Sequence, residues 1–330
     1  MRRFFIVTIT LLLAVSFVAA GFYYITYSQY WMQAHDIGSI ESLEEITIAK
    51  GASSKRIIDD LHKAGIISSP TIFRLYATLE GDTRSYKAGE YQFSASYTPR
   101  EVSKQLVKGA NVVRSVTIVE GWLSQQVVEE LNSANRLTGR IGAVPPQGSL
   151  LPETYFYMTG DSRQNMLAMM QQKMNDVLDA AWKMRQPGLP IKTKQEALIL
   201  ASVVEKETGS NSEERHVASV FINRLRKGMK LQSDPTANYG LYLKTGELKT
   251  RMMLKDVRDV SAYNTYIING LPPKPICNPG RASIEAVMNP ISTKDLYFVA
   301  DGEGGHIFAA TLSQHNRNVA AYRKKMRDMR

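Results

Sequence analysis

The sequence predicts an α+β protein with one N-terminal transmembrane helix, a small α+β module and a larger mixed α/β domain. Residues 4–27 carry no charged side chain, and from residue 46 onward strand-type runs alternate with capped helix patterns. The length agrees, because 330 residues make about two domains of ordinary size. Hydrophobic residues make up 44% of the chain and charged residues 22%, which excludes wholesale disorder and a multi-span membrane protein.

Cysteine content and charge limit the function further. Cys277 is the only cysteine in the sequence, so an intramolecular disulfide and a zinc site built on several thiolates are excluded. The net charge of +10 favours anionic partners, such as nucleic acid, lipid headgroups or an acidic polymer, without choosing among them.

The N-terminal segment sets the compartment. Residues 4–27 exceed the about 20 apolar residues that cross a bilayer core, so they are predicted to be an anchor. Arg2 and Arg3 predict that residues 1–3 are a cytoplasmic tip and that the rest of the chain lies outside the inner membrane, in the periplasm or its equivalent. Aromatic residues gather where the outer interface would lie, at Tyr23, Tyr24, Tyr27, Tyr30 and Trp31.

A cleaved signal peptide is the alternative for this segment, because Val18, Ala19 and Ala20 resemble a small-residue cleavage site. Bulky aromatic residues continue the apolar run beyond Ala20, and this favours the anchor. Both interpretations export the remaining chain, which disfavours nucleic acid as the partner of its positive charge.

Local signals then predict the elements in order. Residues 28–45 are a predicted stalk, since the part from residue 35 onward is polar and acidic without periodicity. Residues 46–112 form the predicted module, with strands at 46–48 and 89–93 and helices that begin after Ser53, at Pro70 and at Pro99. Thr98 and Glu101 form a capping box for the last of these helices.

Residues 113–330 form the predicted larger domain. A strand at 116–119 with its following glycine echoes the strand and glycine at 46–51, which is a weak repeat. The other predicted elements are a loop at 138–152, a methionine-rich helix at 162–185, helices capped by Thr193 and Ser212, a hairpin at 295–310 and a basic helix at 312–329.

Glu205 is the first candidate for a catalytic residue. The helix that Thr193 caps is apolar on nearly every side, and at 100° per residue Glu205 lies within about 20° of Leu198. A carboxyl in such a stripe loses hydration, which favours its protonated form, as a general acid requires. The alternative is that Glu205 and Glu207 lie on a frayed, solvent-exposed helix end or pair with nearby Lys206 and Arg215. Periodicity alone does not choose between the two acids.

Downstream segments dense in proline, glycine and polar residues predict stiff loops, at 231–240, 262–266, 270–276 and 278–280. Their Tyr, Asn, Gln and Asp side chains suit sugar rings and hydroxyls, although surface loops use the same residues. No metal or cofactor is predicted, because the sequence has no H-E-x-x-H, no G-x-G-x-x-G and no P-loop, and His216 lies on a separate predicted helix from Glu205. The absence of G-x-S-x-G argues against a serine hydrolase.

Several ordered blocks together resemble the MltG (YceG-like) family of membrane-anchored endolytic murein transglycosylases. The blocks are residues 201–208 (ASVVEKET), 217–225 (VASVFINRL), 231–236 (LQSDPT), 263–266 (YNTY), 270–273 (GLPP) and 278–280 (NPG). The segment LPETY at 151–155 resembles a family segment that more often has Asp where Glu153 stands.

The resemblance implies a LysM-like module at 46–112 and a catalytic domain at 113–330. It implies that Glu205 is the catalytic glutamate, and that the β-1,4 bond between N-acetylmuramic acid and N-acetylglucosamine is cut within glycan strands. The muramic C6 hydroxyl attacks its own C1 and leaves a 1,6-anhydro end, so a single carboxyl can serve as general acid and base.

Peptidoglycan strands are accordingly the expected substrate, nascent strands above all, with peptidoglycan synthases as candidate partners. The candidate sugar contacts in the polar loops are Gln232, Ser233, Asp234, Tyr263, Asn264 and Asn278. Two alternatives stay open: a non-catalytic wall-binding or assembly protein, and a hydrolytic muramidase with Glu153 or Asp234 as a second acid.

Overall fold

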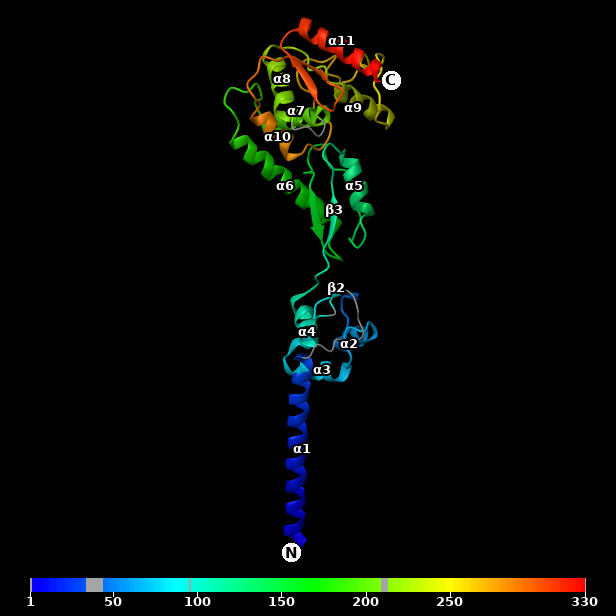
Figure 1. Ribbon diagram of the computed structural model, residues 1–330, viewed down its shortest axis with the longest axis vertical. Coiled ribbons are helices and arrows are strands. Elements are labelled where there is room, and N and C mark those ends of the chain that lie inside the picture. Colours follow the sequence, from blue (N-terminus) through cyan, green and yellow to red (C-terminus); the bar gives the residue numbers. More distant parts are fainter. Residues whose placement is uncertain (1, 34–43, 95, 209–212, 330) are drawn as a thin grey trace. The chain divides into compact units, whose positions relative to one another are not determined.

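The computed structural model describes residues 2–33, 44–94, 96–208 and 213–329. It has two compact units: Met1–Arg114 with Phe156–Gly160, and Ser115–Tyr155 with Asp161–Arg330. Helices and short strands alternate in both units (Figure 1), so the predicted mixture of helix and strand is confirmed.

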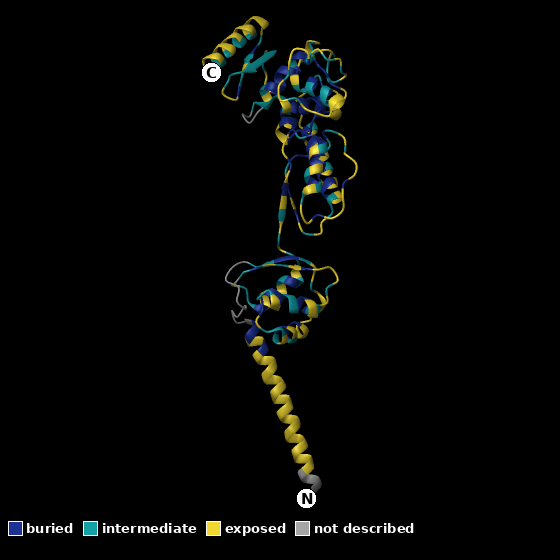
Figure 2. Ribbon diagram, turned by 90° about the vertical axis from the view of Figure 1, so that its right-hand side faces the viewer, coloured by how far each residue is buried: buried dark blue, intermediate teal, exposed yellow. Residues whose placement is uncertain are grey.

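The chain begins with a long helix, α1 (Arg2–Gln33). Its segment Ile6–Met32 is long and apolar enough to cross a membrane, and Figure 2 shows it exposed along most of its length. The helix does not end at residue 27 but continues into the predicted stalk, of which residues 34–43 lie outside the described part. Trp31, predicted to lie in an aromatic cluster at the outer membrane interface, is buried with Met32 in the core of the first unit.

In the first unit, two helices lie along the chain between two strands that pair with each other. The elements are β1 (Glu44–Ile48), α2 (Ser54–Lys63), α3 (Pro70–Leu79), a 3-10 turn (Asp82–Arg84), β2 (Gly89–Phe93) and α4 (Pro99–Lys108). Strands β1 and β2 are antiparallel, with Ile48 opposite Gly89. The predicted caps are confirmed: Ser53 accepts from the Arg56 N–H at 3.2 Å, and Thr98 and Glu101 form the capping box.

The second unit is a helical core with two small strand pairs. Its helices are α5 (Ser124–Ser133), α6 (Arg163–Lys183), α7 (Lys194–Glu207), α8 (Glu214–Arg226), α9 (Asp234–Thr245), α10 (Arg281–Met288) and α11 (Leu312–Asp328). Strand β3 (Arg114–Thr117) pairs with β4 (Thr154–Tyr157), although Arg114 and the end of β4 from Phe156 are counted with the first unit. Strand β5 (Tyr297–Ala300) forms an antiparallel hairpin with β6 (His306–Ala309). The predicted hairpin and terminal helix are therefore confirmed.

Helix α7 is the centre of this core. Every residue from Ala197 to Val204 is buried, as its sequence predicts, and α7 packs against α6, α8 and α10 (Figure 1). The buried Ser202 hydroxyl donates to the Ile199 carbonyl at 2.7 Å and accepts from the Ile276 N–H at 3.0 Å. This second bond fixes the segment before α10 to the side of α7.

Two helices differ from the predictions. Residues 231–240 were predicted to be a loop, but α9 begins at Asp234. Pro235 is compatible with a helix in its first turn, where the missing N–H has no partner to lose, and Asp234 complements the positive end of the helix dipole. Helix α10 was not predicted, because Asn278, Pro279 and Gly280 read as a turn and the helix begins directly after them.

Gly148 and Gly139 give a matched test of this packing. Both have a left-handed φ, +80° and +75°, but only at Gly148 would a Cβ atom meet Pro275, at 2.8 Å. We expect Gly139→Ala to lose about 1–2 kcal/mol of stability from the backbone conformation alone. Gly148→Ala should lose about 1–3 kcal/mol more through overpacking. Thermal unfolding of the detergent-solubilised variants measures the difference, and equal Tm shifts would contradict the close packing of Pro275.

Candidate active site

Glu205 projects from the last turn of the buried helix α7 and is itself part-buried. Its Oε2 accepts a hydrogen bond from the Gly280 N–H at 2.9 Å. Gly280 is the residue directly before α10, so the carboxyl is tied to a second element of the core. Glu205 is therefore held in one place rather than extended into solvent.

The turn between β3 and α5 covers Glu205 from another side. Gly121 has a φ of +77°, and its N–H donates to the Asn278 carbonyl at 2.9 Å. A Cβ atom on Gly121 would lie 3.6 Å from Glu205 Cγ and 3.4 Å from Lys206 Cδ. Glycine thus permits the left-handed turn, whereas a Cβ atom there would make only ordinary contacts with α7.

Glu120 brings a second carboxyl to this place. A side chain on Gly280 would collide with Glu120 Oε1, so the Glu120 carboxyl lies directly against the Gly280 backbone. Partial burial raises the pKa of Glu120, and the charges of Glu205 and Glu214 raise it further. Glu120 nevertheless remains exposed as a residue. Two acids therefore meet around one glycine, with one of them open to solvent.

The buried amides Asn278 and Asn264 make only protein contacts. The Asn278 side chain donates to the Trp122 carbonyl and to Ser124 Oγ, and it accepts from the Leu150 N–H. The Asn264 side chain donates to the carbonyls of Val257 and Asp259 and accepts from the Tyr266 N–H. Both side chains are fully buried, so direct contact of either with a sugar stays a prediction that this geometry does not favour.

The other predicted sugar contacts differ in exposure. Gln232 is exposed and has a left-handed φ of +50°, whereas the next residue, Ser233, is buried. Asp234 is exposed and accepts from the Tyr266 hydroxyl at 2.6 Å. Tyr263 is part-buried, with its ring edge-on to Tyr239 at 5.0 Å between centroids.

Glu207 lies with Gln232 and Asp234 rather than with Glu205. These three line a hollow of about 370 Å³ together with Tyr266. Burial raises the pKa of Glu207 to about 7; the charge of Asp234 adds to this effect, while Ser233 and Arg224 oppose it. The sequence could not choose between the two glutamates, and the structure gives them separate surroundings.

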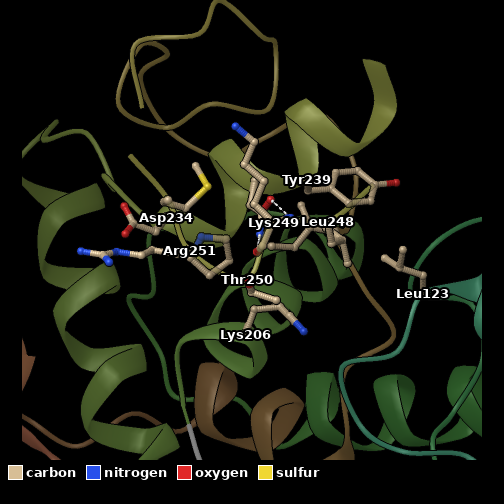
Figure 3. Close-up of a pocket in the computed structure, with 12 residues that line it drawn as sticks. Leu123, Lys206, Asp234, Tyr239, Leu248, Lys249, Thr250 and Arg251 are labelled. Atoms are coloured by element: carbon tan, nitrogen blue, oxygen red, sulfur yellow. Dashed lines mark hydrogen bonds between the residues drawn. The ribbon is translucent and has the colours of Figure 1, made fainter. Parts of the chain in front are cut away.

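A larger hollow of about 550 Å³ lies beside Lys206, the residue after Glu205. Figure 3 shows Asp234 and Arg251 at one end of it and Leu123 at the other, with Tyr239 along the wall. Its lining is polar as well as apolar, as a sugar-binding surface requires.

A third hollow, of about 720 Å³, lies beside Arg281, the residue after Gly280. Glu214, Glu285 and Asn289 line it together with apolar residues of α6 and α10. The contact between Glu205 and Gly280 therefore has a hollow next to each of the two chain segments that form it.

The acids considered for a muramidase have other partners. Glu153 pairs with Lys173 at 2.6 Å, and Asp234 is bonded to Tyr266. His216, considered as a metal ligand, lies 2.8 Å from Asp295 and stacks on Phe308. Within residues 2–33, 44–94, 96–208 and 213–329, no group of three or more His, Cys, Asp or Glu could hold a metal ion.

Glu120 is the residue of this site that sequence reasoning missed. One signal could have found it. The two similar strand-glycine segments differ just before their glycine, where the first has Lys50 and the second Glu120. An acidic residue directly before a glycine in a turn indicates a candidate functional residue. Nothing in the local sequence indicates that this turn lies against α7.

Known proteins resemble this chain along most of its length. The endolytic murein transglycosylase of Bacillus subtilis (strain 168) is 29% identical over an alignment of 310 residues, and the match covers 84% of this chain and 84% of that protein. The protein of the same name from Streptococcus pneumoniae (strain D39) is 26% identical over 326 residues, and the match covers 84% of this chain and 58% of that protein.

A solved structure of a related protein also resembles this chain. The crystal structure of a yceG-like protein from Listeria monocytogenes is 27% identical, with a TM-score of 0.53, over 84% of this chain and 99% of that one. Residues 46–321 match the YceG-like family itself. The resemblance that the sequence blocks predicted is thus confirmed, and the chain belongs to the YceG-like family.

Proposed function

We propose that this chain is a membrane-anchored endolytic lytic transglycosylase that cuts the MurNAc-β-1,4-GlcNAc bond within peptidoglycan strands. The observation that carries the proposal is the Glu205 carboxyl, held by the Gly280 N–H at 2.9 Å on a buried helix. The residues that follow Glu205 and Gly280, which are Lys206 and Arg281, each line a hollow. The relatives named endolytic murein transglycosylase support the same activity.

The chemistry needs few protein groups, because the substrate supplies its own nucleophile. As the bond between C1 and the leaving oxygen breaks, a carboxyl gives a proton to that oxygen. The muramic C6 hydroxyl then bonds to C1 and gives up its proton, so no water is consumed. Glu205 serves as the general acid and base in the simplest form of this mechanism, whereas ordinary glycosidases need two carboxyls.

The hollows beside Lys206 and Arg281 suit an enzyme that cuts within a glycan strand. An endolytic enzyme has to hold sugars before and after the bond that it cuts, so its groove cannot end at the catalytic group. We propose that the glycan runs from the hollow beside Lys206, past Glu205, to the hollow beside Arg281. Asp234 lines the first hollow and is the sugar contact best placed for this path, whereas Gln232 lines the smaller hollow beside Glu207. Tyr263 stays a candidate sugar contact.

Asn278, Asn264 and Ser233 support the same site indirectly in this proposal. Their side chains are buried, and the two amides hold loops through bonds to backbone groups. The Ser233 N–H donates to the Thr265 hydroxyl at 2.9 Å at the start of α9, where Asp234 lies. We assign the direct contact with sugar to exposed groups such as Asp234.

The small module fits the same function. Residues 46–112 contain the order strand, helix, helix, strand, with β1 and β2 antiparallel, which is the order of a LysM-like module. We propose that it binds glycan strands next to the membrane, where α1 anchors it with the N-terminus in the cytoplasm. Action on nascent strands, limiting their length beside the synthases, follows from this location.

Glu205→Gln tests the proposed role of this carboxyl. The amide keeps the shape and can still accept from the Gly280 N–H, but it cannot transfer a proton, so strand cutting should fall by at least about 100-fold. Purified full-length variant in detergent is incubated with peptidoglycan strands, and new chain ends are identified by mass spectrometry. Full activity of this variant would rule out the assignment.

The wild-type products decide among the three functions. Anhydro ends support the transglycosylase and reducing ends a muramidase, while intact strands that still bind the protein support a wall-binding role.

Glu207→Gln is the matched control on the same helix end. We expect most of the activity to remain, because Glu207 faces the separate hollow with Asp234. Loss of turnover in this variant, with Glu205→Gln active, would reverse the roles of the two glutamates.

The Glu207 variant should also change how stability depends on pH. The folded protein holds a proton on Glu207 up to about pH 7, whereas the unfolded chain releases it near the ordinary value of 4.5. The folded state therefore loses up to about 3 kcal/mol of this group's contribution as pH rises through that window. The Tm of Glu207→Gln relative to wild type should increase from pH 5 to pH 8, and a constant difference would contradict a buried, protonated Glu207.

A further inference from the structure

We propose that Glu120 is a second catalytic carboxyl, which donates the proton to the leaving oxygen while Glu205 takes the proton of the C6 hydroxyl. This inference rests on the proposed transglycosylase function and changes only one part of it, namely that one carboxyl performs both transfers.

The geometry places both carboxyls at one backbone position. Glu205 Oε2 accepts the Gly280 N–H at 2.9 Å, and Glu120 Oε1 occupies the space where a side chain of residue 280 would be. Gly280 has an ordinary φ of −73°, so the backbone conformation does not require a glycine there. The absent side chain instead provides room for the Glu120 carboxyl.

The two carboxyls have different surroundings, and the difference suits opposite roles. Glu205 accepts a backbone N–H, an interaction that suits a carboxylate acting as a base. Glu120 has a raised pKa because of partial burial and of the facing charges of Glu205 and Glu214. Lys206 is another charged group at this turn, and its Nζ donates to the Gly121 carbonyl at 3.5 Å. Glu120 is thus the member of the pair that retains a proton more readily than an ordinary glutamate.

The reaction itself favours neighbouring carboxyls. In a β-linked sugar that closes a 1,6-anhydro ring, the oxygen that leaves C1 and the oxygen that attacks it lie on the same face of the ring. Glycosidases that use water or a protein nucleophile place their two carboxyls on opposite sides of the bond. A pair gathered around one glycine can instead reach both oxygens from one side.

Each proton has a defined path. Glu120 gives its proton to the leaving oxygen as the C1–O bond breaks, and Glu205 receives the C6 hydroxyl proton as the new C6–O–C1 bridge forms. The cycle ends with Glu120 ionised and Glu205 protonated. Transfer between the two carboxyls, or exchange with solvent at the exposed Glu120, restores the starting state.

A substrate with an activated leaving group separates the two roles. The probe is a synthetic GlcNAc–MurNAc glycoside with 4-nitrophenol in place of the next sugar, because nitrophenolate leaves without a proton. Glu120→Gln should lose at least about 100-fold on natural strands. On the nitrophenyl substrate the same variant should keep a rate within about tenfold of wild type, since only the acid has been removed. Glu205→Gln should fail on both substrates.

Two more variants serve as checks. Gly280→Ala pushes the Glu120 carboxyl away without changing either acid, and it should show the same substrate-dependent loss. Glu129→Gln, which alters an exposed carboxyl on the following helix, should match wild type on both substrates.

The outcomes are decisive for the inference. Glu120→Gln with a near-normal rate on natural strands would overturn it and leave Glu205 as the single acid and base. Equal losses of Glu120→Gln on natural strands and on the nitrophenyl substrate would also overturn it. So would a near-normal rate of Glu205→Gln on the nitrophenyl substrate. Failure of the wild type to produce anhydro ends would instead reject the proposed function itself.

Discussion

The attachment of one short segment to helix α7 is the constraint on which the site depends. The Ile276 N–H binds Ser202, the Asn278 backbone and side chain bind the turn at residues 121–122, and the Gly280 N–H binds Glu205. These bonds join α7, the turn after β3 and the start of α10. Since the partners are buried or part-buried, loss of any one would leave an unsatisfied polar group in the core.

Local signals were sufficient to predict helix α7, although they did not choose between its two glutamates, Glu205 and Glu207. Thr193 caps the helix as expected, and the apolar run from Ala197 to Val204 is buried on all sides. These features depend on residues close in sequence, where periodicity and capping act. The prediction of a loop at residues 231–240 was wrong, because a proline in a polar segment fits a loop and the first turn of a helix equally well.

The pairing of Glu120 with Glu205 could not be predicted in this way. It depends on Gly121 and Asn278, which are more than 150 positions apart and are joined by backbone hydrogen bonds. Asn278 itself looked like a sugar contact, because an amide in a Pro-Gly turn has the same local appearance whether it faces solvent or the core. Only the tertiary structure shows that its side chain forms hydrogen bonds with Trp122, Ser124 and Leu150.

Glu205 and Glu207 show why a raised pKa alone is a poor guide to the catalytic group here. Two residues apart on one helix, they face different surroundings, and burial raises the pKa of Glu207, which lies in the smaller hollow beside Asp234 and Arg224. Structural charge clusters perturb a carboxyl as strongly as active sites do. Access is the better criterion. Lys206, the residue after Glu205, and Arg281, the residue after Gly280, each line a hollow large enough for sugars, and a second acid lies at Gly280. A polymer that must pass the reacting group on both sides requires that access before it requires any particular proton affinity.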